Sequence, residues 1–151
     1  MKIIRGLHNL TSQHFGCVAT IGNFDGVHLG HVEILKRLII KSAHYKVPSV
    51  VILFEPQPAE FFRYGRIPAR LSRLSEKAQL IFACGVDKIL VLRFSRDLAS
   101  YSPQQFVEEI LVKRMGIKAL IIGDDFRFGT ARGGDFSLLT SLATKHQFSL
   151  D

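Results

Sequence analysis

Cysteines, long apolar runs and blocks of like charge are all scarce in this chain of 151 residues. The two cysteines, Cys17 and Cys84, are far apart and form no C-x-x-C pair, which excludes a disulfide scaffold and favours a reducing cytoplasm. No apolar run reaches the roughly 18 residues that a membrane helix needs. The apolar part of residues 1–6 is too short for a signal peptide. We therefore expect no membrane partner.

No run of five or more lysines and arginines occurs either, yet the net charge is +7. That balance suits an anionic ligand, such as a nucleotide, a nucleic acid or an acidic membrane surface, but it does not choose among them. It is equally compatible with a protein that is simply basic. With 47% apolar and 22% charged residues the chain can bury a core, which excludes disorder as its dominant state.

Strand-like and helix-like segments alternate along the sequence. Short apolar runs predict strands at residues 17–21, 50–54, 89–92 and 117–122, with a further strand beginning near 148. Apolar spacing and helix-boundary residues predict helices over residues 32–45, from Leu74 to Gly85, from Pro103 to Gly116, and over 136–145. Continuous apolar strands joined by helices of this length predict a parallel sheet with helices on both faces.

The expected fold is therefore a three-layer, Rossmann-like α/β domain. Ligands of such sheets bind at the carboxyl ends of the strands, near the point where the strand order reverses. The segments that follow Ile21, Phe54, Leu92 and Ile122 are the places to look for a site.

The stretch Gly-Asn-Phe-Asp-Gly-Val-His-Leu-Gly-His at residues 22–31 follows the first of these strands and opens the first helix. Its glycines permit close backbone approach, and the helix start offers free N–H groups and a positive dipole end to an anion. His28 and His31 are three residues apart and share one helical face. Two imidazoles beside a helix N-terminus suit a polyphosphate.

Three other interpretations of this stretch remain: a turn with no ligand, half of a zinc site, or two satisfied core histidines. Zinc needs three or four ligands, and no cysteine or glutamate stands at a matching spacing near the pair, so no metal ligands are predicted. Neither the Walker pattern nor the G-x-G-x-x-G dinucleotide fingerprint occurs.

Residues 22–31 resemble the H-x-G-H signature of the nucleotidyltransferase superfamily, whose sheet is of the HUP type. The full string resembles, more narrowly, the adenylyltransferase (FAD synthetase) domain of prokaryotic bifunctional riboflavin kinase/FMN adenylyltransferases. Further stretches agree with that family: Phe-Glu-Pro-Gln-Pro at 54–58, Glu-Lys at 76–77 with Gly-Val-Asp at 85–87, and Gly-Asp-Asp-Phe-Arg-Phe-Gly at 123–129 with Arg-Gly-Gly-Asp at 132–135.

The resemblance implies transfer of AMP from ATP to FMN, with FAD and pyrophosphate as products and Mg²⁺ accompanying ATP. FMN brings an ionised phosphate as its own nucleophile, so the protein must align two anions and stabilise the charge that develops. His28 and His31 would contact the ATP phosphates as the catalytic pair. The other expected ATP-site residues are Gly22, Asn23, Phe24, Asp25, Gly30 and Arg132.

A flavin needs a flat apolar slot with a few polar edges. The expected FMN-binding residues are Pro56, Pro58, Phe62, Asp125, Arg127 and Phe128, with Phe62 and Phe128 as the preferred ring contacts. The alternative for each phenylalanine is an ordinary place in the core.

Members of that family also carry a Ser-Ser-Thr-x-x-Arg segment after the last helix, and a riboflavin kinase domain. This sequence stops at Asp151 before either. We expect residues 1–151 to be an FMN adenylyltransferase domain that is shortened at its C-terminal end, from a parent that also phosphorylates riboflavin. Two alternatives remain: a nucleotidyltransferase with another acceptor, and a non-catalytic module that binds nucleotides or RNA. No nucleic-acid partner is expected, and the oligomeric state is open.

Overall fold

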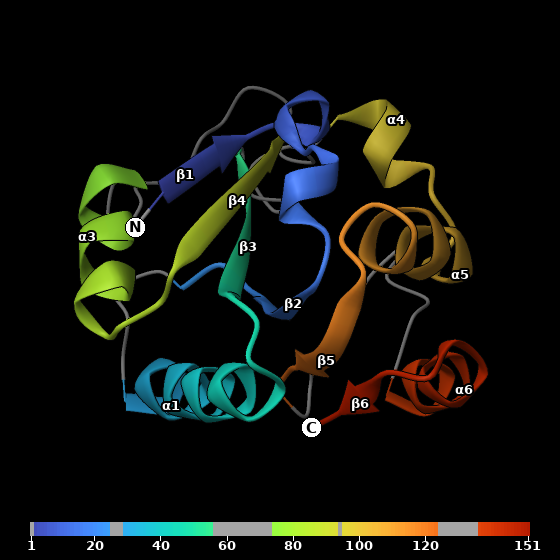
Figure 1. Ribbon diagram of the computed structural model, residues 1–151. Coiled ribbons are helices and arrows are strands. Elements are labelled where there is room, and N and C mark those ends of the chain that lie inside the picture. The colour runs from blue at the N-terminus through green and yellow to red at the C-terminus, as the bar shows by residue number, and fades with distance from the viewer. Residues whose placement is uncertain (1, 25–28, 56–73, 94, 124–135) are drawn as a thin grey trace.

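The computed structural model describes residues 2–24, 29–55, 74–93, 95–123 and 136–151. Within these residues six strands form one sheet in the order β1-β4-β3-β2-β5-β6, and every neighbouring pair is parallel (Figure 1). The strands are β1 (Lys2–Arg5), β2 (Cys17–Ile21), β3 (Ser49–Glu55), β4 (Lys88–Arg93), β5 (Ile117–Ile121) and β6 (Ser149–Leu150).

The strands that the apolar runs predict are confirmed to within two residues at their ends. All five residues of β2 are buried, as are the first five of β3, because helices cover both faces of the sheet. Strand β1 has no counterpart among the predictions. It is an edge strand of four residues with only Ile4 buried, so its sequence carries no long apolar run.

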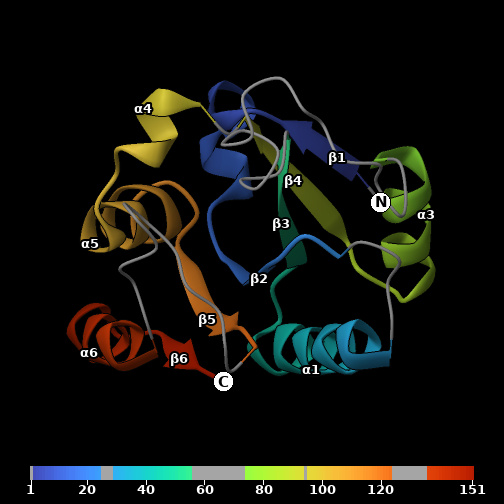
Figure 2. The ribbon, with the colours of Figure 1, turned by 180° about the vertical axis from the view of Figure 1, so that it is seen from behind.

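Helices cover the sheet on both sides, which confirms the three-layer fold. On one face α1 (Leu29–Tyr45) and α3 (Leu74–Ala83) share a core cluster that includes Leu35, Leu38 and Ile81. A second cluster, on the other face, holds buried side chains of α4 (Arg96–Ala99), η3 (Phe106–Val112) and α6 (Phe136–His146). The short helices η1 (Leu7–Asn9) and η2 (Ser12–His14) contribute no buried side chain. Opposite views of the molecule both show α3 beside β1 and α6 beside β6 (Figures 1 and 2).

The predicted helix after Ser102 begins as its sequence indicates and then changes type. At α5 (Pro103–Gln105) the Ser102 hydroxyl accepts from the Gln105 N–H at 3.1 Å, and the Gln105 side chain accepts from the Ser102 N–H at 2.9 Å. From Phe106 the chain continues as the π-helix η3, with the Lys113 N–H bonded to the Glu108 carbonyl at 3.1 Å. The capping box sets where the helix begins, and packing sets its pitch.

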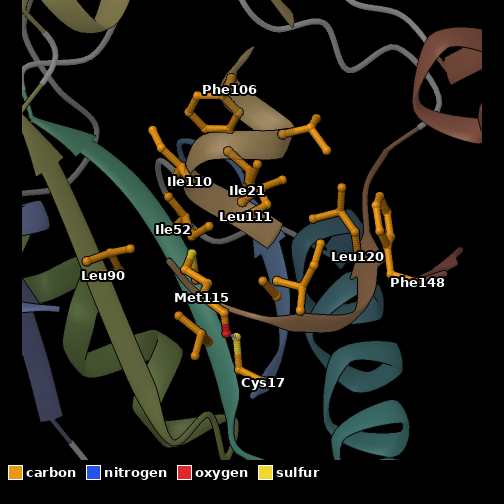
Figure 3. Packing of buried hydrophobic residues seen from close by; sticks show 14 of the residues in the cluster. Cys17, Ile21, Ile52, Leu90, Phe106, Ile110, Leu111, Met115, Leu120 and Phe148 are labelled. Atoms are coloured by element: carbon orange, nitrogen blue, oxygen red, sulfur yellow. Dashed lines mark hydrogen bonds between the residues drawn. The ribbon is translucent and has the colours of Figure 1, made fainter. Parts of the chain in front are cut away.

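The second core cluster fills the space between η3 and the sheet (Figure 3). Phe106, Ile110 and Leu111 project from η3 toward Ile21 and Ile52 of the sheet. Near the start of β2 the Cys17 thiol donates to the Met115 carbonyl at 3.7 Å. Helix η3 therefore packs against β2 and β3, the strands that lead into the motifs at residues 22–31 and 54–58.

Candidate functional site

The strand order reverses between β2 and β5. From β2 the chain proceeds outward through β3 and β4, and it then crosses to the other side of β2 to form β5. In parallel sheets the connections that leave two such strands run to opposite faces of the sheet, and ligands bind in the crevice between them, outside the carboxyl ends of the strands. Gly22 follows β2 directly, and the chain from Ile122 follows β5, so two of the sequence motifs start at this switch point.

A buried hydroxyl joins the two strands at their carboxyl ends. Thr20 is the register partner of Ile121, and its hydroxyl donates to the Ile121 carbonyl at 2.6 Å. Only 1% of Thr20 is exposed. This bond fixes the spacing of β2 and β5 directly beneath the residues that leave the sheet.

The residues after β2 turn sharply into the molecule. The Gly22 N–H still pairs with the Ile52 carbonyl of β3, at 3.2 Å, and Asn23 is exposed. Phe24 then adopts a φ of 54° and buries its side chain in the core cluster of α1 and α3. A Cβ on Gly22 would lie 2.8 Å from the buried Phe24 ring, so any other residue here would force that ring to move.

Helix α1 begins at Leu29 and places Gly30 and His31 in its first turn. Gly30 is exposed, and His31 is half-buried. The rings of Phe24 and His31 lie with their centroids 4.8 Å apart at an angle of 43°, and Nδ1 of His31 is shielded from solvent. The structure thus brings Gly22, Phe24 and His31 together at the carboxyl edge of the sheet.

The remaining predicted site residues lie outside the described residues. They are His28 and Asp25 of the motif, Arg132, and the FMN-binding set Pro56, Pro58, Phe62, Asp125, Arg127 and Phe128. Among the residues that the structure does describe, no three His, Cys, Asp or Glu side chains lie together as metal ligands would. Those residues also include no helix that is long and apolar enough to cross a membrane.

One titratable side chain near this edge entered the sequence analysis only as part of the Glu-Lys stretch at 76–77, with no role predicted for it. Lys77 is 3% exposed, in the second turn of α3. Because α3 leads from β3 back to the start of the parallel strand β4, its N-terminal end lies toward the carboxyl edge of the sheet. The available signal was the helical spacing: Lys77 falls on the same face as Leu74, Ala78 and Ile81, where a lysine is unusual.

Known proteins resemble this chain over nearly all of its length. The family model of FAD synthetase matches residues 10–151. The bifunctional riboflavin kinase/FMN adenylyltransferase of Escherichia coli K12 is 48% identical over 151 residues, which cover 99% of this chain and 48% of that protein. The protein of the same name from Pseudomonas fluorescens is 48% identical over 100% of this chain and 48% of its own length. The chain therefore spans about half the length of the curated relatives it matches.

A solved structure, described as a macrolide-efflux protein from Streptococcus pneumoniae, has the same fold. It superposes with a TM-score of 0.83 at 22% identity, over 98% of this chain and 48% of that chain. At this identity the likeness concerns the fold alone, and it agrees with the Rossmann-like sheet described above. The family model, the two relatives and the motif at the switch point lead to one assignment: this chain belongs to the FAD synthetase family.

Proposed function

We propose that this chain transfers the adenylyl group of ATP to FMN. A phosphate oxygen of FMN attacks the α-phosphorus of ATP, the bond from that phosphorus to the β-phosphate bridging oxygen breaks, and FAD and pyrophosphate are formed. The observation that carries this proposal is the match of residues 10–151 to the FAD synthetase model. The names of the curated relatives state two activities, riboflavin kinase and FMN adenylyltransferase. The model that matches this chain is that of FAD synthetase, which supports adenylyl transfer rather than the kinase activity for residues 10–151.

The geometry at the switch point suits such a reaction. The reacting groups are both anions, so the protein must hold them in line and stabilise the charge that moves to the leaving pyrophosphate. The start of the long helix α1 supplies N–H groups and a positive dipole end, and His31 stands in its first turn. We propose that the ATP phosphates bind here, with Gly22, Asn23 and Gly30 forming the backbone of the cradle.

Mg²⁺ is part of the proposal as the companion of ATP. This ion is usually held by one or two carboxylates together with substrate phosphates and water. Asn23 and Gly30 are exposed at this edge, so an ion brought in by the nucleotide would meet solvent-accessible residues of the motif. It would supply neutralising charge, while the residues of this chain supply orientation.

Incubation of the chain with FMN, ATP and Mg²⁺, followed by chromatography, tests the proposal through the appearance of FAD. Loss of the imidazole in His31→Ala should lower kcat by about 10²–10³-fold, which corresponds to about 2.7–4 kcal/mol of transition-state stabilisation. His44→Ala is the matched control, because His44 lies exposed in the last turn of the same helix. Unchanged turnover in His31→Ala would remove His31 from the mechanism.

A titration of FMN fluorescence separates this function from transfer to another acceptor. Quenching by the protein is expected, because a flavin bound in an apolar slot is held against neighbouring groups. If the protein consumes ATP with a different acceptor and leaves the FMN signal unchanged, the substrate assignment is wrong. RNA binding that weakens steeply with salt, with no FAD formed, would favour the non-catalytic module.

A further inference from the structure

We propose that Phe24 is a positioning residue for His31: its ring fixes the direction in which the imidazole faces the phosphate site. The inference rests on the function proposed above and deepens it. Phe24 is 2% exposed, so its side chain has almost no surface to offer a nucleotide. Any effect on the site therefore passes through the groups that its ring touches.

The backbone at Phe24 is held in an unfavourable conformation. Its φ of 54° lies in the left-handed region, which a bulky side chain adopts rarely and at a cost. The burial of its ring in the cluster of α1 and α3, which includes Leu35 and Leu38, offsets that cost. Strain that the surrounding packing maintains is a common feature of functional sites.

The ring of Phe24 lies close to two residues of the motif. A Cβ at Gly22 would approach the ring to 2.8 Å. The imidazole of His31 lies with its centroid 4.8 Å from that of the ring. A side chain in the first turn of a helix can otherwise occupy several staggered rotamers. Contact with a ring that is itself fixed by Gly22 and by the core restricts that choice.

The two imidazole nitrogens of His31 are not equivalent. Nδ1 is shielded from solvent, although the residue as a whole is only half-buried. In the proposed arrangement Nε2 faces the phosphate oxygen, and the contact with Phe24 holds the ring in that orientation. Catalytic groups act only when they are held within about 0.5 Å of the productive position. Phe24 supplies that restraint without touching the substrate.

Two measurements on the Phe24→Leu variant test this role. Leucine keeps an apolar, branched side chain in the core but removes the ring, at the cost of some volume. Three-bond couplings should show one χ1 rotamer for His31 in the unaltered protein and averaging in the variant. Calorimetry should show about tenfold weaker binding of Mg²⁺-pyrophosphate, which corresponds to about 1.4 kcal/mol. Phe24→Met, which also lacks the ring, provides the same test if the leucine variant does not fold.

Phe148→Leu is the matched control. Phe148 is also buried, at 6% exposed, but it belongs to the core cluster on the other face of the sheet. Both variants should lose a similar amount of stability, because each removes a buried ring. Only the change at Phe24 should alter the His31 rotamer and the affinity for pyrophosphate. An unchanged rotamer in Phe24→Leu would overturn the proposal.

A double-mutant cycle identifies the route of the effect. If Phe24 acts through His31, Phe24→Leu should weaken pyrophosphate binding in the unaltered protein and have no further effect in the His31→Ala background. An equal weakening in both backgrounds would contradict the proposal. If the unaltered protein does not bind pyrophosphate, the proposed function fails, and the rotamer measurement still decides whether Phe24 positions His31.

Discussion

The two cysteines occupy different environments, and this difference sets their chemistry. Cys17 is 1% exposed at the start of β2, and burial raises the pKa of its thiol to about 12, against a weaker lowering effect of Lys88. Cys84 is partly exposed just after α3. Because the thiolate is the reactive form, Cys17 is inert in the folded protein and contributes as a small apolar side chain.

The free energy of unfolding should therefore fall at alkaline pH because of Cys17. In the unfolded chain its thiol ionises near its ordinary value of 9.0, whereas in the folded chain it keeps its proton up to about 12. The stabilisation is complete below pH 9 and is lost as the pH rises toward 12. Each unit in that window removes up to about 1.4 kcal/mol.

Urea unfolding at pH 8 to 10.5 measures this loss. The curve for Cys17→Ala should be flatter than the curve for the unaltered protein, because the variant has no such thiol. Parallel curves for the unaltered protein and Cys17→Ala would show that Cys17 ionises equally in both states.

At the scale of elements, a polar contact joins α6 to η3. Glu108 of η3 accepts from Nε2 of His146 at 2.6 Å and from Nζ of Lys145 at 3.2 Å. These hydrogen bonds, with that of His146 foremost, hold the pKa of Glu108 below its ordinary value. The contact therefore joins the last turn of α6 to η3.

Glu108→Gln should lower the free energy of unfolding at neutral pH. A carboxyl with a lowered pKa stabilises the folded state above its ordinary pKa of 4.5, and that contribution is lost as the pH falls through its folded value. The difference in the free energy of unfolding between the variant and the unaltered protein should therefore disappear in acid. The measurement is the urea midpoint between pH 7 and pH 3.

Glu109→Gln provides the control on the same element. Glu109 pairs with Lys113 at 3.0 Å on an exposed face, where such pairs contribute little. We expect almost no change at either pH. A loss as large as that of Glu108→Gln, or a gap for Glu108→Gln that persists at pH 3, would mean that the contact with α6 does not stabilise the fold.

Elements with a strong local pattern could be predicted from the sequence, and those that depend on tertiary context could not. The helix predicted over residues 136–145 extends over Phe136–His146, because its apolar spacing and basic last turn are local signals. The π-helical pitch of η3 and the edge strand β1 depend on packing against distant residues. The phosphate-binding motif at residues 22–31 could be predicted, because glycines and histidines at this spacing beside a helix start are typical of an anion site. The contact of Phe24 with His31 could not, because it requires a left-handed residue that no spacing reveals.

At the scale of the whole molecule, the excess of positive charge does not locate the site by itself. A hollow of about 570 Å³ lies at the opposite edge of the sheet from the candidate site, among the starts of β1 and β4 and the end of α1. Its lining includes Lys2, Lys46 and Lys88, with Asp87 as its acidic member. Net charge would permit an anion at either edge. The helix start, the glycines and the strand-order reversal favour the carboxyl edge.

The central claim is that the nucleotide phosphates bind at the carboxyl edge, beside the start of α1. Mapping backbone amide shifts by NMR during titration with Mg²⁺-ATP tests it most directly, because both edges are observed in one experiment. The account predicts saturable shifts at Gly22, Asn23, Gly30 and His31, with little change at Lys46 and Lys88. Shifts confined to the lysine-lined hollow, with residues 22–31 unaffected, would contradict it.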